Sequence, residues 1–102
     1  MRAMEFKFLR KKLVEDEIGI QKEEITESEE IPIIKHEEIY AKEFYQANEV
    51  GYKPSLRLRI SALNYNQEEE LIYMGKTYTI IRISEPNADE VILVCEVKLK
   101  NV

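Results

Sequence analysis

The chain is poor in the residue types on which cross-links, metal sites and phosphate-binding loops depend. Its 102 residues include one cysteine, one histidine, three glycines and no tryptophan. The single cysteine, Cys95, excludes a disulfide framework within the chain and favours a reducing compartment. Three isolated glycines cannot form a glycine-rich phosphate loop, and a metal centre would require further histidines or paired cysteines. We therefore expect neither a metal nor a cofactor.

Long hydrophobic runs are also missing. No segment approaches the ~20 apolar residues of a membrane-spanning helix, and the first residues lack the apolar core of a signal peptide. We therefore expect a soluble intracellular protein that makes no membrane contact. The length suits a single domain over residues 1–102, with one modest hydrophobic core.

Charge is plentiful but unevenly distributed. Acidic residues outnumber lysines and arginines by 20 to 15, and the resulting net charge of −5 disfavours generic nucleic-acid binding, because such binding neutralises phosphates. Residues 1–14 contain five bases and one acid, residues 15–30 contain eight acids and one base, and residues 51–66 contain three bases and no acid. Segregation of this kind is suited to orienting one protein surface against another.

Alternating apolar and polar residues indicate a β-rich C-terminal half. Residues 56–61 alternate Leu or Ile with Arg or Ser, which predicts a strand with one buried and one polar face. Residues 70–74 and 77–84 predict a hairpin around Gly75-Lys76, since glycine readily adopts the left-handed backbone of tight turns. Residues 90–99 predict a last strand with one fully apolar face.

The N-terminal half gives a weaker pattern. Residues 5–13 alternate weakly and predict a first strand, and extended structure resumes over residues 31–40. Residues 22–30 hold five glutamates and no apolar helical stripe, so we predict a long mobile loop between two strands. Residues 41–50 favour one short helix that ends at Gly51. The expected fold is all-β: a small barrel or sandwich of about six mostly antiparallel strands, with a long acidic loop and at most one short helix.

Only Cys95 and His36 offer nucleophilic chemistry. A reactive thiolate needs a nearby base or positive field, but Cys95 shares the apolar register of Val91 and Leu93 and is predicted to pack as a small hydrophobe. His36 lies in a run of charged surface residues. The many glutamate pairs, and the run Glu68-Glu69-Glu70, indicate solvated surface, because general acid–base catalysis requires a carboxylate in an apolar environment. We expect no catalytic residue and no enzymatic activity.

A cationic face is a candidate binding site. Arg57 and Arg59 on one strand, with Arg82 from the hairpin, can gather on one outer face of the sheet. The simplest interpretation is solubility and protection of a sheet edge; the functional one is contact with an acidic partner surface or with passing DNA. Tyr73 and Tyr78 flank the hairpin and are predicted to form a cross-strand pair rather than to stack on bases.

Several short motifs follow one another between residues 17 and 98. They are Glu17-Ile18-Gly19-Ile20-Gln21, Glu43-Phe44-Tyr45-Gln46-Ala47, Gly51-Tyr52-Lys53-Pro54, Asn64-Tyr65, the run 72–82 and the run 90–95. In their order and spacing these motifs resemble the head–tail joining proteins of tailed bacteriophages, also called head-closure or stopper proteins. The chain departs from the family pattern at Ile81, near which an aromatic residue is usual, and at residues 68–70, where glutamates replace a simpler turn.

The resemblance implies a structural protein of a phage or prophage, present in the host cytoplasm during assembly and then at the head–tail interface of the virion. It implies a small β-barrel that forms a homo-oligomeric ring beneath the portal or adaptor protein, closes the DNA-filled head and receives the tail proteins. It also implies a mobile loop in the DNA channel. Residues 22–30 are our candidate for that loop, because acidic side chains repel passing phosphates instead of binding them. The residues concerned are Glu23, Glu24, Glu27, Glu29 and Glu30.

The alternative is a small β-barrel binding module that recognises protein or single-stranded nucleic acid. It would use the face formed by Arg57, Arg59 and Arg82. A connector should associate weakly when alone and form rings on its portal or adaptor, whereas a nucleic-acid module should bind oligonucleotides with a clear dependence on salt.

Overall fold

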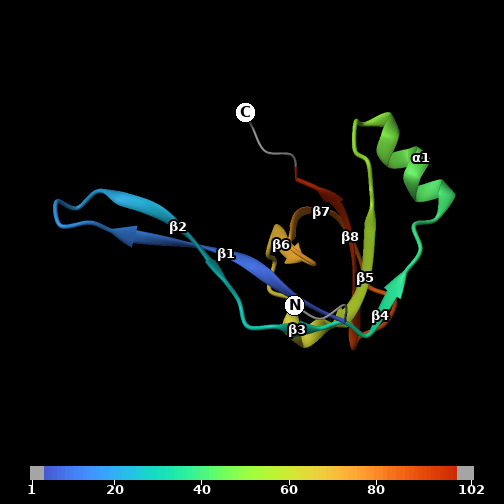
Figure 1. Cartoon of the computed structure of the whole chain (residues 1–102), viewed down its shortest axis with the longest axis horizontal. Coiled ribbons are helices and arrows are strands. Elements are labelled where there is room, and N and C mark those ends of the chain that lie inside the picture. Colours follow the sequence, from blue (N-terminus) through green and yellow to red (C-terminus); the bar gives the residue numbers. More distant parts are fainter. Residues whose placement is uncertain (1–3, 99–102) are drawn as a thin grey trace.

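The computed structural model describes residues 4–98, apart from three side chains of its helix at positions 43, 44 and 47 (Figure 1). Within this range the prediction of an all-β fold with one short helix is confirmed. The strands are more numerous than expected, since there are eight. In chain order the elements are β1 (Glu5–Glu15), β2 (Gln21–Glu27), β3 (Ile31–Pro32), β4 (Lys35–Glu37), α1 (Ala41–Glu49), β5 (Leu56–Ser61), a 3-10 turn (Ala62–Asn64), β6 (Glu70–Tyr73), β7 (Lys76–Ser84) and β8 (Glu90–Val97).

The strands form one antiparallel sheet that is not closed. Its order is β2-β1-β6-β7-β8-β5-β4, and β3 lies beside the start of β1. The segment 31–37 connects the two ends of this sheet. The Ile33 N–H donates to the carbonyl of Met4 at 2.8 Å, and the Ile34 N–H donates to the carbonyl of Arg59 at 2.8 Å. The sheet therefore curls around its inner face, although β2 and β4 remain at its edges.

The hydrophobic core fills the inner face of the curled sheet. Phe6 and Phe8 are completely buried, and their rings meet edge to face with centroids 4.8 Å apart. Burial of each such side chain contributes about 2–3 kcal/mol. The other buried members come from β3, the residue after it, and β5, β6, β7 and β8: Ile31, Ile33, Leu56, Leu58, Ile60, Leu71, Tyr78, Val91, Leu93 and Cys95.

The predicted hairpin between β6 and β7 is confirmed, but its turn lies one residue earlier than expected. Tyr73 pairs with Lys76, so the two loop residues are Met74 and Gly75, with φ of 49° and 79°. Two consecutive positive φ values define a type I′ turn, whose twist matches that of the flanking strands. Tyr73 and Tyr78 are diagonal rather than opposite neighbours, with ring centroids 6.5 Å apart.

Helix α1 lies at the other end of the molecule from the tip of the β1–β2 hairpin, as Figure 1 shows. The predicted helix over residues 41–50 is confirmed, and Gly51 follows it with φ of 89°, a conformation that suits the residue after a helix. The helix stands over the outer face of the sheet, where Ile92 and Val94 of β8 are also buried. The last strand is thus covered on both of its faces.

Candidate functional site

The β1–β2 hairpin projects from the body of the molecule as a two-stranded arm (Figure 1). We define the arm as residues 10–27. The Cα radius of gyration is 15.1 Å, compared with about 13 Å for a compact chain of this length. All seven residues of β2 are exposed, so no other part of residues 4–98 covers either face of this strand. A two-stranded hairpin with two bare faces has little stability of its own.

The prediction of a mobile loop over residues 22–30 is wrong. Residues 21–27 form β2, which pairs with β1 from Leu9↔Glu27 to Glu15↔Gln21. The reason is the charge of the partner strand, because β1 places its bases beside the acids of β2 and opposite charges across an antiparallel pair stabilise it. Lys11 lies 3.9 Å from Glu23, and Lys12 stands opposite Glu24.

The five candidate glutamates do not form one cluster. The side chains of a strand alternate between its two faces, so Glu23 and Glu27 lie on one face of the arm and Glu24 lies on the other. Glu29 follows the arm and accepts a 3.4 Å hydrogen bond from Arg10. Glu30 is exposed beyond it. A role of these residues in lining a DNA channel stays a prediction.

The tip of the arm is an ordered loop built around Asp16. Its carboxylate accepts hydrogen bonds from the N–H groups of Ile18 at 3.0 Å and Ile20 at 2.9 Å. Its backbone N–H donates to the carbonyl of Ile20 at 2.9 Å. Gly19 has φ of 85°, which an L side chain rarely adopts. The loop therefore holds Ile18, whose exposed fraction is 80%, at its middle, between Asp16 and Ile20.

Further aliphatic side chains follow the tip along the arm. Ile20, Leu13 and Ile25 are all exposed. Leu13 stands opposite Glu23 and Lys11 stands opposite Ile25, so Leu13 and Ile25 are diagonal neighbours on one face. Several exposed aliphatic residues gathered on one projection indicate an interaction site more strongly than scattered ones do.

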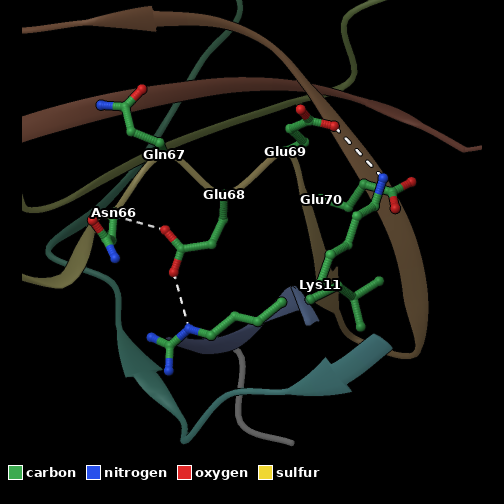
Figure 2. A pocket seen from close by; sticks show the side chains of 8 residues that line it. Lys11, Asn66, Gln67, Glu68, Glu69 and Glu70 are labelled. Atoms are coloured by element: carbon green, nitrogen blue, oxygen red, sulfur yellow. Dashed lines mark hydrogen bonds and ion pairs between the residues drawn. The ribbon is translucent and has the colours of Figure 1, made fainter. Parts of the chain in front are cut away.

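The root of the arm is held by the glutamate run 68–70, which Figure 2 shows around a hollow of about 300 Å³. The Glu68 carboxylate accepts hydrogen bonds from Arg10 Nε at 3.1 Å and from the Asn66 N–H at 2.6 Å. The hydrogen bond to Glu68 raises the pKa of Arg10. Lys11 lies 3.7 Å from Glu69. This network joins the arm to the body.

Interpreting the run as solvated surface is wrong for two of its members, since Glu68 and Glu70 are buried. The Glu70 carboxylate forms an ion pair with the Lys98 ammonium group, whose Nζ lies 2.6 Å from Oε2. Glu68 and Glu70 can be buried because Arg10 of β1 and Lys98 after β8 supply their bases, and neither base is close in sequence.

The structure brings Arg57 and Arg59 together. Both bind one acid, Glu37, which the sequence predicted to be a solvated surface residue. Glu37 of β4 stands opposite Arg57. Its two carboxylate oxygens accept hydrogen bonds from Arg57 Nε at 3.1 Å and Arg59 Nε at 2.5 Å. Arg59 also contacts Glu90 at 3.1 Å. Since β5 lies between β4 and β8, the interpretation of these arginines as edge protection is wrong.

Hydrogen bonding controls the ionisation of this cluster. Burial disfavours the charged form of Glu37, but the bonds from Arg59 and Arg57 outweigh it and hold the pKa below its usual value of 4.5. The same contact, together with Glu90, raises the pKa of Arg59. The pKa of Glu90 is lowered by hydrogen bonds from Asn87 and Arg59. All members therefore stay charged at neutral pH.

A groove runs between α1 and the outer face of the sheet, and we call it the α1 groove. One part, of about 390 Å³, is lined by Tyr40, Lys42, Gln46, Arg57, Arg82 and Ser84. An adjoining part of about 220 Å³ shares Gln46 and Arg82, and is lined also by Val50, Tyr52, Pro54 and Ile81.

The α1 groove is cationic at one end and apolar at the other. Its described lining residues include three cations, Lys42, Arg57 and Arg82, and no acid. A bulge in β7 at Ile81 sets Arg82 opposite Val94, which brings Arg82 to the outer face. Arg57 is 6% exposed, and its guanidinium carbon lies 4.6 Å from the centroid of the Tyr40 ring, a cation–π contact.

Cys95 and His36, the two residues considered for nucleophilic chemistry, lie in different surroundings. Cys95 is completely buried in the core, and desolvation raises the pKa of its thiol to about 12, so its packing role is confirmed. His36 Nε2 lies 2.7 Å from the hydroxyl of Tyr73. Within residues 4–98 no group of three or more potential metal ligands comes together, and no helix in that range is long and apolar enough to span a membrane.

Comparison with known proteins adds no assignment. No protein-family model matches the chain, and no curated protein matches it significantly. The resemblance to head–tail joining proteins stays a prediction from the order of the motifs, and the geometry of the arm and the α1 groove carries the functional argument.

Proposed function

We propose that this chain is a structural component of a tailed-phage head–tail junction, which assembles as a homo-oligomeric ring beneath a portal or adaptor protein and connects the closed head to the tail. The observation that carries the proposal is the arm. It is ordered, projects from a small β body, and exposes both faces. Such an element is suited to contacts between subunits, because the chain alone leaves it uncovered.

The charge of the arm supports a place beside passing DNA rather than a DNA-binding site. Within the arm, residues 15–27 contain six acids and one base, and residues 10–12 of β1 add three bases. Acids facing a channel repel phosphates, so DNA can pass without adhering. The arm takes over the role that we predicted for a mobile loop, and a paired strand can hold these acids in fixed positions.

The experiment is deletion of the gene in the phage or prophage that encodes the chain, followed by electron microscopy of the particles. We expect DNA-filled heads without tails, and recovery of tailed particles when the wild-type chain is supplied. Infectious tailed particles without the chain would refute the proposal.

The acidic residues of β2, together with the two glutamates that follow the arm, can be tested in the same complementation assay. The variant replaces Glu23, Glu24, Glu27, Glu29 and Glu30 with glutamine. We expect altered head closure or DNA release while the body of the molecule stays folded, because these side chains are exposed and lie outside the core. The control replaces three exposed acids outside the arm, Glu38, Glu49 and Glu85, with glutamine. Equal infectivity of both variants would exclude a role of the arm charges.

The alternative, a binding module that uses the arginine face, has weaker support. Glu37 already binds Arg57 and Arg59, so an acidic partner would have to displace it. Oligonucleotide binding whose affinity falls steeply with salt, and is lost in Arg82→Glu, would favour this alternative.

A further inference from the structure

We propose that the tip of the arm of one copy docks into the α1 groove of a second copy, in a head-to-tail contact. This inference rests on the proposed function, since it names the surfaces through which the ring would form. The arm and α1 lie at opposite ends of the molecule (Figure 1), whose longest extent is 51 Å. A chain cannot place its own tip in its own groove, but a neighbouring copy can.

The two surfaces match in shape and apolarity. The tip presents Ile18 and Ile20 on a loop fixed by Asp16. The apolar part of the α1 groove has a volume of about 220 Å³, room for one or two aliphatic side chains, and Val50 and Tyr52 at its edge are exposed. Transfer of an exposed aliphatic side chain into such a site is favourable by about 1.5–3 kcal/mol.

The two surfaces also match in charge. Three acids stand at the tip, namely Glu15, Asp16 and Glu17. The described lining of the α1 groove carries three cations, Lys42, Arg57 and Arg82, of which Arg57 also binds Glu37. Complementary charge fixes the orientation of a contact and repels wrong partners.

A contact of this kind is heterologous, because each copy offers a tip and a groove that are different surfaces. Heterologous contacts generate closed rings when the rotation closes and filaments when it does not. One tip in one groove makes a small interface, and small interfaces are weak and transient. We therefore expect weak association in solution.

The experiment captures this weak contact by cross-linking between two full-length variants. One carries Ile18→Cys at the tip, and the other carries Tyr52→Cys or Val50→Cys in the groove. A short bismaleimide reagent joins thiols that meet. Cys95 does not interfere, because its thiol is buried and protonated. The control variant is Leu63→Cys, whose side chain is 96% exposed and lies outside both surfaces.

We expect the tip variant to cross-link to at least one groove variant on the order of 10-fold faster than to the Leu63→Cys control, because docking raises the effective concentration of the two thiols. Addition of Arg82→Glu to the groove variant should return the rate to that of the control. Equal rates for groove and control positions would overturn the inference, as would rapid cross-linking of the tip variant to itself. Deletion of the gene tests the proposed function independently, so the proposed function and the docking of the tip in the α1 groove can each fail without the other.

Discussion

Glu37 is the residue on which most of the charge balance of the outer sheet face depends. It comes from the three-residue strand β4, and it binds one arginine with each of its carboxylate oxygens. Because Arg57 is almost completely buried, its charge requires a partner inside the protein. Loss of Glu37 would leave two neighbouring cations without this acid.

We therefore expect Glu37→Gln to lower the free energy of unfolding by about 2 kcal/mol, the contribution of a hydrogen bond to a charged group. Urea unfolding monitored by circular dichroism measures this change. The matched control is Glu38→Gln, since Glu38 is the exposed neighbour and its substitution should change stability by less than about 0.5 kcal/mol. Equal effects of the two substitutions would contradict the assignment.

The lowered pKa of Glu37 also makes stability depend on pH. Its folded pKa lies below the ordinary value of 4.5, so the stabilisation is fully present above pH 4.5 and is lost as pH falls through the folded pKa. In Glu37→Gln the loss of stability with acid should be smaller. Some loss will remain, because the pKa of Glu90 is lowered as well.

At the scale of elements, the turn between β6 and β7 depends on backbone conformation more than on contacts. Met74 and Gly75 both have positive φ, which an L residue with a side chain adopts at a cost of about 1–2 kcal/mol. A Cβ atom added at Gly75 would meet no other atom within 4 Å. Any cost of substitution there is therefore conformational.

Gly75→Ala should lower stability by about 1 kcal/mol, which shifts the melting temperature of a domain of this size by about 4–8 °C. Met74→Asn should preserve or raise stability, since asparagine followed by glycine is favoured in type I′ turns. Thermal unfolding measures both. Lys76→Ala, at the first residue of β7, serves as the neutral control. A Gly75→Ala protein with the same melting temperature as the wild type would refute this account of the turn.

Elements whose stabilising partners are close in sequence were predictable, and those with distant partners were not. The β6–β7 hairpin and the alternation of β5 and β8 are local patterns. The strand β2 has no apolar pattern of its own and forms because β1 supplies bases opposite its acids. Glu68 is buried because Arg10, far away in sequence, reaches it. Glu37 could have been found from the alternation of a strand at residues 35–37, but three residues give little signal.

At the scale of the whole molecule, stability is unequal between the body and the arm. Strands β5 and β8 lie inside the sheet, with a covered inner face and a largely covered outer face. The outer part of the arm has one ladder of hydrogen bonds and two bare faces. Local opening is therefore easiest in the arm.

Hydrogen exchange should show this gradient. We expect backbone amides of residues 11–25 to exchange orders of magnitude faster than those of residues 57–60 and 91–95, because only the latter require global unfolding. In an assembled ring the arm amides should become protected while those of the body stay unchanged. Uniform protection of the isolated chain would show that the arm is covered in solution.

The position of β1 in the sheet also determines when the arm can be anchored. Lys7 pairs with Ile72, and Phe8 pairs with Leu71. The root of the arm therefore cannot be attached to the body until β6 has been synthesised. Closing so long a loop costs several kcal/mol of chain entropy before any contact forms, and such topologies fold slowly. During synthesis the N-terminal ribbon, with its exposed isoleucines, emerges from the ribosome well before its site of attachment. Newly made chains therefore pass through a stage in which β1 has no partners but β2 and β3.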